Sequence, residues 1–501
     1  MKKHIGLIIF LFTYFVYVLF SYRSFGITWD EQAVYERGKM LYQHLIDPNR
    51  SSDPNLIIRK SKDDVWPTYN NTYAMTLYAF NKDKSYDIYH LENLIFASSI
   101  FIFAYIFLYK KYKNTWAAIL GPLFIALSPR FFGDLPANPK DMPFAVFYFI
   151  STSLIFLTHS FKSPLLRVLL LGILFGLAQT TRSLGFSLYI LLFVYDFLKR
   201  DKNSGFMKFF INESLFIFMV FMTSNMVVLL TWPYIASNYF KNFLDVLNVS
   251  KQFPWMRNIF FLGRDYHSTA LTPFYIPIWF LVSLPVFIIA GTVASLVMFK
   301  RFLKNDIYLL SVGALVLNLG MYFVMRPIVY DGVRHFLFLI PFFSMLAAIF
   351  VIEISRPGFE KIKKPIYIFV LVNCLLVVVA QVRLFPYTYV YFNEFVGGVK
   401  GAYKYFEIDY WNASFKESIE WLKENELVDG KKYSIYTCST SLSILNYFTY
   451  DMSVAYKVNE ADYAVCLARG NEYKKIPGEI LHIVKRDSVP LNYVIKVDKS
   501  Q

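Results

Sequence analysis

Long apolar runs recur along this chain, and they constrain its fold more than any other feature of the sequence. Several run for about 18 to 22 residues with almost no charge, long enough to cross roughly 30 Å of hydrocarbon. Charged residues make up only 17% of the 501 residues and hydrophobic residues 56%, whereas soluble domains are about 25% charged. The sequence therefore predicts an α-helical polytopic membrane protein.

Hydropathy predicts about eleven membrane-spanning helices. Their approximate bounds are 5–21, 92–109, 115–128, 142–160, 165–180, 183–198, 210–230, 275–298, 307–325, 336–354 and 366–384. The first run starts with positive charge, as a signal peptide does, but bulky Phe and Tyr stand where a small-residue cleavage site is needed. We therefore expect this run to be retained as the first span.

Lysine and arginine gather in alternate connections between the apolar runs. These connections hold Lys2-Lys3, “YKKYKN”, Lys162 with Arg167, “KRDKNSGFMK”, “FKRFLKND” and “SRPGFEKIKKP”. Short connections rich in Lys and Arg face the cytoplasm, so the N-terminus is expected inside. An odd number of spans then places the C-terminal region outside. The net charge of +15 is spread over these connections and does not indicate a nucleic-acid partner.

The chain divides into a membrane domain, residues 1–385, and a C-terminal region, residues 386–501. The segment “ASFKESIEWLKENEL” has helical periodicity, and Gly430 ends it. Three segments read as short strands: “KYSIYTC”, “ADYAVCLA” and “LNYVIKV”. We expect a small extracytoplasmic α/β domain. Of the three cysteines, Cys374 lies in an apolar run, whereas Cys438 and Cys466 lie in this region, and the sequence leaves open whether they pair.

Acidic residues stand at the outward ends of two spans. Asp30 and Glu31 follow the first span directly, close to any lipid-borne reactant. The second outward loop, “SPRFFGDLPANPKDMP”, carries Asp134, Lys140 and Asp141 between prolines that hold its backbone. Asp141 is either the N-cap of the next helix or one half of a carboxylate pair with Asp30. The remaining acids of the first outward loop are read as ordinary solvated charge: Glu36, Asp63 and Asp64.

Basic residues also gather in the outward loops, where the distribution of Lys and Arg in membrane proteins disfavours them. They are Arg182, Arg264, His267, Arg326, Arg334 and His335. Arginine suits phosphate because its planar guanidinium binds two oxygens at once. His267 can equally be an ordinary surface histidine. Outward acids beside outward cations indicate transfer of a group from a phosphate leaving group, carried on a polyprenyl chain that stays in the bilayer.

These motifs resemble the GT-C superfamily of integral-membrane glycosyltransferases. The similarity rests on Asp30-Glu31 after the first span and on “NPKDMPFA” before the fourth, and it covers roughly residues 5–385. The nearest branch holds protein O-mannosyltransferases and the aminoarabinose transferase of lipid A. The resemblance implies Asp30 as general base, Asp141 as supporting residue and Glu31 as a third catalytic candidate. It also implies a sugar donor on polyprenyl phosphate, inversion of the anomeric centre, and an acceptor hydroxyl on a glycan, lipid or protein.

The sequence departs from some members of this family. It has no insert of the MIR β-trefoil type, which argues against a eukaryotic-style protein mannosyltransferase and, with the lack of targeting signals, favours the bacterial plasma (inner) membrane. A divalent metal is compatible with the family but not required, and Glu31 with His267 is the pair we consider for it. Secondary sugar-binding candidates lie in an aromatic stretch: Glu394, Asp409, Tyr410 and Trp411.

A polytopic transporter or a flippase for lipid-linked sugars is the alternative function. Such a protein uses a similar number of helices, but it places ionisable residues near the bilayer midplane and is built from two matching halves. Here the spans carry almost no charge, the acids stand in loops, and no internal repeat is visible. The sequence therefore favours sugar transfer.

Overall fold

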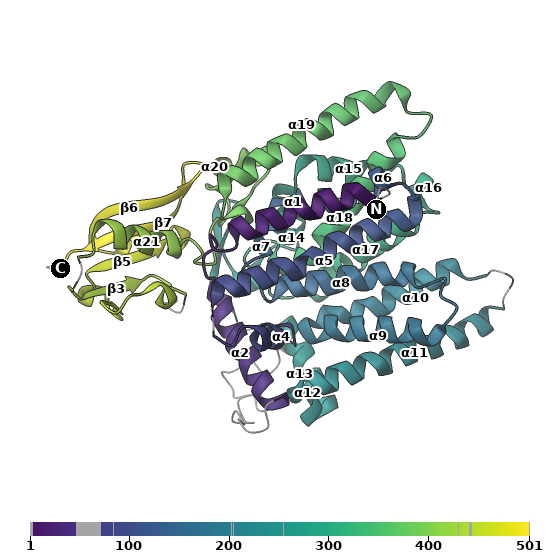
Figure 1. Cartoon of the computed structure of the whole chain (residues 1–501), viewed down its shortest axis with the longest axis horizontal. Coiled ribbons are helices and arrows are strands. Elements are labelled where there is room, and N and C mark those ends of the chain that lie inside the picture. The colour runs from purple at the N-terminus through teal and green to yellow at the C-terminus, as the bar shows by residue number, and fades with distance from the viewer. Residues whose placement is uncertain are drawn as a thin grey trace.

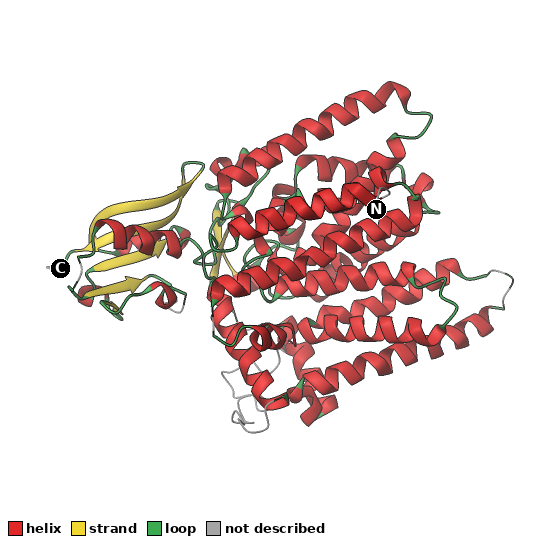
Figure 2. Cartoon of the chain, in the orientation of Figure 1, coloured by secondary structure: helices red, strands yellow, loops and turns green. Residues whose placement is uncertain are grey.

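The computed structural model describes residues 4–46, 72–83, 85–201, 203, 205–253, 255–428, 430–439 and 443–499. Helices form one large bundle, and a small α/β domain stands at one end of it (Figure 1). Strands gather in that domain and in a short hairpin where the two parts meet (Figure 2). Lys2, Lys3, Asp63 and Asp64, on which the sequence carried predictions, lie outside the described residues.

The bundle contains the following helices in chain order: α1 (Ile5–Ser21), α2 (Trp29–Leu45), α4 (Thr72–Phe80), α5 (Tyr86–Tyr112), α6 (Thr115–Ala126), α7 (Pro129–Asp134), α8 (Asp141–Leu157), α9 (Pro164–Thr181), η3 (Ser183–Phe186), α10 (Ser187–Lys199), α11 (Phe206–Thr231), α12 (Pro233–Ser237), α13 (Tyr239–Lys251), η4 (Ser268–Ala270), α14 (Tyr275–Ser283), α15 (Val286–Val297), α16 (Phe299–Phe302), α17 (Asp306–Met325), η5 (Arg334–Leu339), α18 (Ile340–Ile354) and α19 (Glu360–Leu384). Each apolar run predicted from the sequence falls on one or two of these helices.

Six described helices are long and apolar enough to cross a membrane unaided: α5, α9, α11, α17, η5 with α18, and α19. A seventh crossing is made if α14 and α15 are counted together, but the two are bent by 118°. The span predicted over 275–298 is therefore broken into two helices, and the sequence did not predict this break. Pro285 lies at the break, and proline cannot donate the backbone hydrogen bond that a continuous helix requires there. Three further helices, α1, α6 and α8, are apolar but shorter. The span predicted over 183–198 falls on η3 and the 13-residue helix α10.

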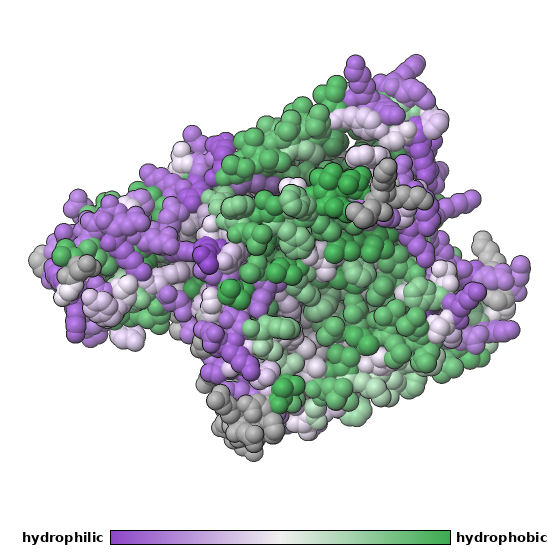
Figure 3. Space-filling view, in the orientation of Figure 1, coloured by the Kyte–Doolittle hydropathy of each residue, from purple (hydrophilic) through white to green (hydrophobic). Residues whose placement is uncertain are grey.

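Apolar side chains cover the middle of the bundle. Figure 3 shows a hydrophobic band between two polar ends, and large side chains such as Phe20, Leu230 and Val382 are largely exposed within the described residues. Soluble proteins rarely expose apolar patches beyond a few hundred Å². The band is the surface that lipid tails would cover, and it confirms the membrane setting.

The Lys- and Arg-rich connections meet at the end of the bundle away from the α/β domain. Lys111 lies 2.8 Å from Asp306, which also pairs with Lys199, so three connections share one carboxylate. Arg167 and Asp196 form a further pair at 2.8 Å. The alternate loops, including those with Asp30 and Asp141, lie at the opposite end. The two sets of loops are thus segregated as the sequence predicted.

The C-terminal domain is a five-stranded sheet with order β4-β3-β5-β7-β6, covered by one helix. The elements are α21 (Phe415–Asn425), β3 (Tyr433–Thr437), β4 (Met452–Val454), β5 (Tyr463–Leu467), β6 (Gly478–Arg486) and β7 (Val489–Val497). The helix and strands β3, β5 and β7 lie where the sequence predicts them. Strands β4 and β6 were not predicted. Cys438, directly after β3, forms a disulfide with Cys466 of the neighbouring strand β5.

Residues 385–412 connect α19 to the α/β domain and pack within the core of the bundle. Tyr389, Phe406 and Trp411 are buried there with side chains of the membrane helices. The backbone N–H of Trp29 donates to the carbonyl of Trp411 over 3.1 Å. A Cβ atom at Gly26 would lie 1.9 Å from the carbonyl oxygen of Ala413, so only glycine permits this approach. The connection therefore holds the first outward loop directly.

Candidate active site

Asp30 lies in the first turn of α2, just beyond the first span. A negative charge is favourable at this end of a helix. The backbone N–H of Thr28 donates to Glu31 over 2.6 Å, which fixes the start of the helix as in a capping box. The second oxygen of Glu31 lies 2.9 Å from Nε2 of His90. Asp30 is thereby held with its side chain still 18% exposed, whereas Glu31 is fully buried.

Asp141 is the first residue of α8, and Lys140 occupies the N-cap position. The Oδ1 of Asn138 accepts the N–H of Asp141 over 2.8 Å, so a neighbouring amide orients this turn. The same Asn138 donates through Nδ2 to Asp134 over 2.8 Å. The sequence leaves open whether Asp141 is the N-cap of α8 or forms a carboxylate pair with Asp30. Because Lys140 occupies the N-cap position, the geometry favours the carboxylate pair.

One guanidinium joins the two carboxylates. The Nη2 of Arg334 lies 2.5 Å from Asp30, its Nε lies 3.0 Å from Asp141, and its Nη1 lies 3.2 Å from Asp331. Asp331 and Gly332 both have positive φ, 56° and 71°, and this tight turn brings Asp331 back onto Arg334. The Arg334 side chain is only 2% exposed. A guanidinium carries five N–H donors in a rigid planar arrangement, so a single arginine can contact three carboxylates on different sides.

Further arginines extend this group of charges on both sides. Arg182 pairs with Asp141. On the other side, Arg469 of the α/β domain lies 3.0 Å from Asp331 and 3.1 Å from Glu407. Burial raises the pKa of Asp331, and the two neighbouring arginines oppose that rise. Burial also raises the pKa of Glu407, to about 7, against the lowering effect of Arg469. We call these residues the acid–arginine network: Asp30, Asp141, Asp331, Arg334, Arg182, Arg469 and Glu407.

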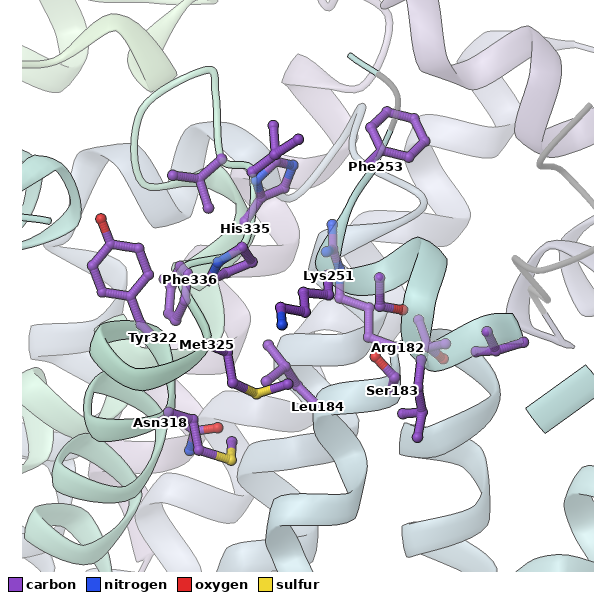
Figure 4. Close-up of a pocket in the computed structure, with 18 of the residues that line it drawn as sticks. Arg182, Ser183, Leu184, Lys251, Phe253, Asn318, Tyr322, Met325, His335 and Phe336 are labelled. Carbon is purple, nitrogen blue, oxygen red and sulfur yellow. The ribbon is translucent and has the colours of Figure 1, made fainter. Parts of the chain in front are cut away.

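A cavity of about 130 Å³ lies beside this network. Its walls come from the ends of α9, α13 and α17, from η3 and from the turn before η5, and most of its lining is apolar. Figure 4 shows Arg182, Lys251 and His335 around this space, with Leu184, Met325 and Phe336 among the apolar side chains. Lys140 also lines it. Burial lowers the pKa of Lys140 to about 8, which the charge of Asp30 partly opposes.

The structure brings most of the predicted site residues together. Asp30, Asp141 and Arg334 meet directly, and Arg182 both pairs with Asp141 and lines the cavity. Lys140 and His335 line the cavity as well, and Asp134 joins Asp141 through Asn138. Burial raises the pKa of Asp134 to about 7. These contacts come from four loops that are far apart in the sequence.

Other predicted residues lie elsewhere. Arg264 and His267 are exposed on the hairpin of β1 (Asn258–Phe261) and β2 (Arg264–His267), and His267 contacts Thr269 over 2.8 Å. Arg326 is exposed at the end of α17. None of these three side chains lines the cavity.

Arg334 was predicted to bind substrate, but its nitrogens face carboxylates and it does not line the cavity. The contacts of Arg334 in the structure are with the three carboxylates. The secondary sugar-binding candidates also differ in position, some being buried and one exposed. Asp409 is buried and accepts from Tyr389 over 2.7 Å, Trp411 packs 5.2 Å from the Arg334 guanidinium, and Glu394 is exposed.

The metal pair considered from the sequence is not formed. The histidine partner of Glu31 is His90, and His267 lies on the exposed hairpin. Within the part of the chain that the structure describes, no three His, Cys, Asp or Glu side chains are grouped as a metal site would need. The charges that gather at the site are instead those of carboxylates and arginines.

Three residues of the site were missed in the sequence. Lys251 ends α13, inside a loop of more than 40 residues where its position carries no signal. Glu407 and Arg469 belong to the connection and the α/β domain, and no local motif marks them. Asp331 was noticed only as a neighbour of Arg334. Long-range docking, which one sequence does not reveal, brings these residues to the site.

Comparison with solved structures shows that the fold of this chain, a helical membrane bundle with a small α/β domain at one end, is similar to that of known membrane proteins. ArnT from Cupriavidus metallidurans bound to undecaprenyl phosphate superposes with a TM-score of 0.55 at 11% identity, covering 97% of each chain. The apo form of that protein gives 0.51 at 11% identity, covering 99% of this chain and 98% of the other.

The archaeal oligosaccharyltransferase AglB from Archaeoglobus fulgidus is a more remote match. It gives a TM-score of 0.49 at 12% identity, covering 93% of this chain and 69% of the other. No protein-family model matches the sequence, and no curated protein matches it. At such low identity the comparisons establish the fold, and the chemistry has to be argued from the residues of this chain.

Proposed function

We propose that this protein is a membrane glycosyltransferase that moves a sugar from a polyprenyl-phosphate donor to an acceptor hydroxyl, with inversion and with Asp30 as general base. The observation that carries the proposal is the meeting of Asp30 and Asp141 on Arg334, beside an apolar cavity rimmed with cations. Acid and phosphate-binding groups are thus adjacent, as transfer from a phosphate leaving group requires.

The cavity suits the end of a lipid that bears a phosphate. Its apolar lining can take isoprene units, and Lys140, Arg182, Lys251 and His335 stand around the same space. A polyprenyl chain remains in the bilayer because each buried CH₂ contributes about 0.8 kcal/mol. Undecaprenyl phosphate is bound in one of the structures with the same fold. We therefore assign the donor phosphate to this cavity.

Asp30 is the best placed of the three carboxylates on Arg334 to act as base. Its side chain is 18% exposed, whereas Asp141 and Asp331 are buried. In the proposed step the acceptor oxygen attacks the anomeric carbon from the side opposite the phosphate. The hydroxyl proton passes to Asp30, and the bond from the anomeric carbon to the phosphate oxygen breaks.

The leaving group is a polyprenyl phosphate that gains one negative charge as the bond breaks. Lys140 and Arg182 lie where that charge would develop, and a preorganised cation in a partly dry site stabilises it without rearrangement. Arg182 also pairs with Asp141. Asp141 therefore serves as the supporting residue that links the donor cations to the base.

The membrane orientation that follows has a cytoplasmic N-terminus and an extracytoplasmic α/β domain. It has eleven spans when the bent pair α14–α15 counts as one span and η3 with α10 as another, beside the six long and three shorter apolar helices. Two features support this orientation. The Lys- and Arg-rich connections share the end that holds Asp306, and such connections stay in the cytoplasm. The α/β domain contains the Cys438–Cys466 disulfide, a bond that persists in oxidising compartments outside the cytosol. A bacterial plasma membrane satisfies both.

The experiment is a panel of radiolabelled polyprenyl-phosphate sugars, each incubated with the purified protein and membrane lipid, glycan and peptide acceptors. We expect label to pass from one donor to one acceptor class, with release of polyprenyl phosphate. If the protein instead carries an intact donor across a vesicle bilayer without cleaving it, the flippase alternative is correct and the transferase proposal is wrong.

A further inference from the structure

Arg469 belongs to the α/β domain, yet its guanidinium reaches the acid–arginine network. It begins η10 (Arg469–Lys475), directly after strand β5, and the preceding Ala468 donates its N–H to Leu491 over 2.9 Å. This hydrogen bond anchors the start of η10 on strand β7. The guanidinium then reaches out of the domain, with Nη1 3.0 Å from Asp331 and Nε 3.1 Å from Glu407.

Asp331 stands between two guanidinium groups from different parts of the chain. Its Oδ1 faces Arg469, and its Oδ2 faces Nη1 of Arg334 over 3.2 Å. The Asp331 side chain has no exposed surface, so these two cations replace the water that an ionised carboxylate needs. Any change at Arg469 is therefore felt at Arg334, one carboxylate away.

An aromatic column provides a second connection from Arg469 to the site. The guanidinium lies 5.8 Å from the ring of Trp255, which stacks on Tyr330 with ring centroids 4.2 Å apart. Tyr330 lines the cavity and meets the ring of His335 edge-on at 4.6 Å. Arg469 thus supports both the acids and one wall of the cavity.

We infer that Arg469 is a positioning residue: it holds Asp331 in place and, through Asp331, sets the position of Arg334 against Asp30. The α/β domain is then a part of the active site and not an appendage to it. The inference rests on the proposed function for its kinetic test only, since the contacts themselves exist whatever the reaction is.

Removal of Arg469 leaves two buried carboxylates, Asp331 and Glu407, without their shared cation. Uncompensated buried charge is costly, so these groups must either bind protons or draw Arg334 toward themselves. Both responses disturb the contact between Arg334 and Asp30. A displacement of about 1 Å at a catalytic group can cost about 100-fold in rate.

The chain offers a matched control in Arg486, a second partly buried arginine that joins the α/β domain to the bundle. Its side chain is 17% exposed against 15% for Arg469. It pairs with Glu417 over 2.7 Å, donates to the carbonyl of Phe385 over 3.0 Å and stacks on Tyr387. It joins the domain to the end of α19 but does not contact the acid–arginine network.

The kinetic test compares Arg469→Gln, Arg469→Lys and Arg486→Gln in the full-length protein. We expect Arg469→Gln to lower kcat by about 10- to 100-fold while the KM for the lipid donor changes by less than about threefold. Arg469→Lys should recover part of the loss. Arg486→Gln should keep near-normal kcat. Equal losses in Arg469→Gln and Arg486→Gln, or no loss in either, would overturn the inference, because docking alone would then explain the contact.

A spectroscopic test does not depend on activity, so it separates failure of this inference from failure of the proposed function. Infrared absorption distinguishes a protonated buried carboxyl from a carboxylate. At about pH 8 we expect Arg469→Gln to gain a protonated-carboxyl signal, because loss of the cation favours the neutral acid. The signal should shrink in the double variant with Glu407→Gln and be absent in Arg486→Gln.

A spectrum of Arg469→Gln identical to that of the unmodified protein contradicts the inference. If Arg469→Gln does not fold, the double variant Arg469→Gln with Glu407→Gln, which has one buried carboxylate fewer, decides: it should still show a protonated-carboxyl signal from Asp331, and absence of that signal contradicts the inference.

Discussion

Arg334 and Asp30 lie 2.5 Å apart, and the same guanidinium reaches Asp141 at 3.0 Å. The two acids that the sequence singled out, more than one hundred residues apart, are therefore neighbours around one cation. This arrangement leaves Asp30 partly open while it buries the other two carboxylates that contact Arg334. The predictions below follow from that difference and from the cavity beside it.

The first prediction concerns Arg334, which we expect to serve the acids and not the donor phosphate. Arg334→Gln removes the shared cation of three carboxylates, so the free energy of unfolding should fall by about 3–5 kcal/mol. Polyprenyl-phosphate binding should change much less than kcat. Thermal unfolding and a lipid-phosphate binding assay measure the two effects. Arg326→Gln, an exposed arginine in the same loop, serves as control; a large loss of donor binding specific to Arg334→Gln would show that it contacts the phosphate after all.

The second prediction concerns the pH dependence of donor binding. Lys140 has a pKa lowered to about 8 by burial, and only its protonated form attracts a phosphate. Affinity for the polyprenyl-phosphate sugar, a phosphodiester whose charge does not change in this range, should therefore be full below about pH 7 and decline as the pH rises through about 8. In Lys140→Gln this decline should vanish and the affinity should fall roughly tenfold, as expected for loss of a charge-assisted hydrogen bond.

The control for Lys140 is Arg264→Gln, an outward cation that does not line the cavity. It should leave both the affinity and its pH dependence unchanged. If Lys140→Gln retains the decline near pH 8, another group is responsible for it.

Much of the site was predictable because hydropathy and the distribution of Lys and Arg in the sequence indicate membrane topology. The alternation of Lys- and Arg-rich connections predicts that Asp30, Asp141 and Arg334 lie at the same end of the bundle. The helices were predictable because an apolar run of membrane-spanning length is visible in the sequence itself. The bend at Pro285 was not predicted, because the hydropathy of 275–298 as a whole is that of one continuous span.

The rest depends on long-range packing. Glu31 follows Thr28 at the spacing of a capping box, and the structure gives it that task together with His90, a partner 59 residues away. Arg469 lies beyond the predicted membrane domain, and only the docking of the α/β domain brings it to Asp331. Sequence patterns report local periodicity and do not report such contacts.

The third prediction concerns Gly26, where the first outward loop passes the connection to the α/β domain. A Cβ atom there would lie 1.9 Å from the carbonyl oxygen of Ala413. Gly26→Ala should therefore separate the two segments, lower the free energy of unfolding by about 1–3 kcal/mol and reduce transfer. Gly320→Ala, where no atom lies within 4 Å, should be tolerated. Wild-type stability in Gly26→Ala would mean that this close approach is not maintained in the membrane.

The fourth prediction concerns orientation. Lys162 and Lys431 are exposed at opposite ends of the molecule, the first between α8 and α9 and the second in the α/β domain. In a background with Cys374→Ser, single variants Lys162→Cys and Lys431→Cys should react with an impermeant maleimide from opposite sides. In intact cells only Lys431→Cys should be labelled. Labelling of Lys162→Cys alone would invert the proposed topology.

The most direct measurement compares Asp30→Asn with Asp265→Asn, a second outward carboxylate that is exposed on the β1–β2 hairpin. Both variants are purified, loaded with radiolabelled polyprenyl-phosphate sugar, and followed through a single turnover. Asp30→Asn should bind the donor normally and transfer at least about 100-fold more slowly, because the acceptor proton has no base to receive it. Asp265→Asn should transfer at the rate of the unmodified protein. Equal single-turnover rates for the two variants would contradict the account, since the acid beside Arg334 would then have no part in the reaction.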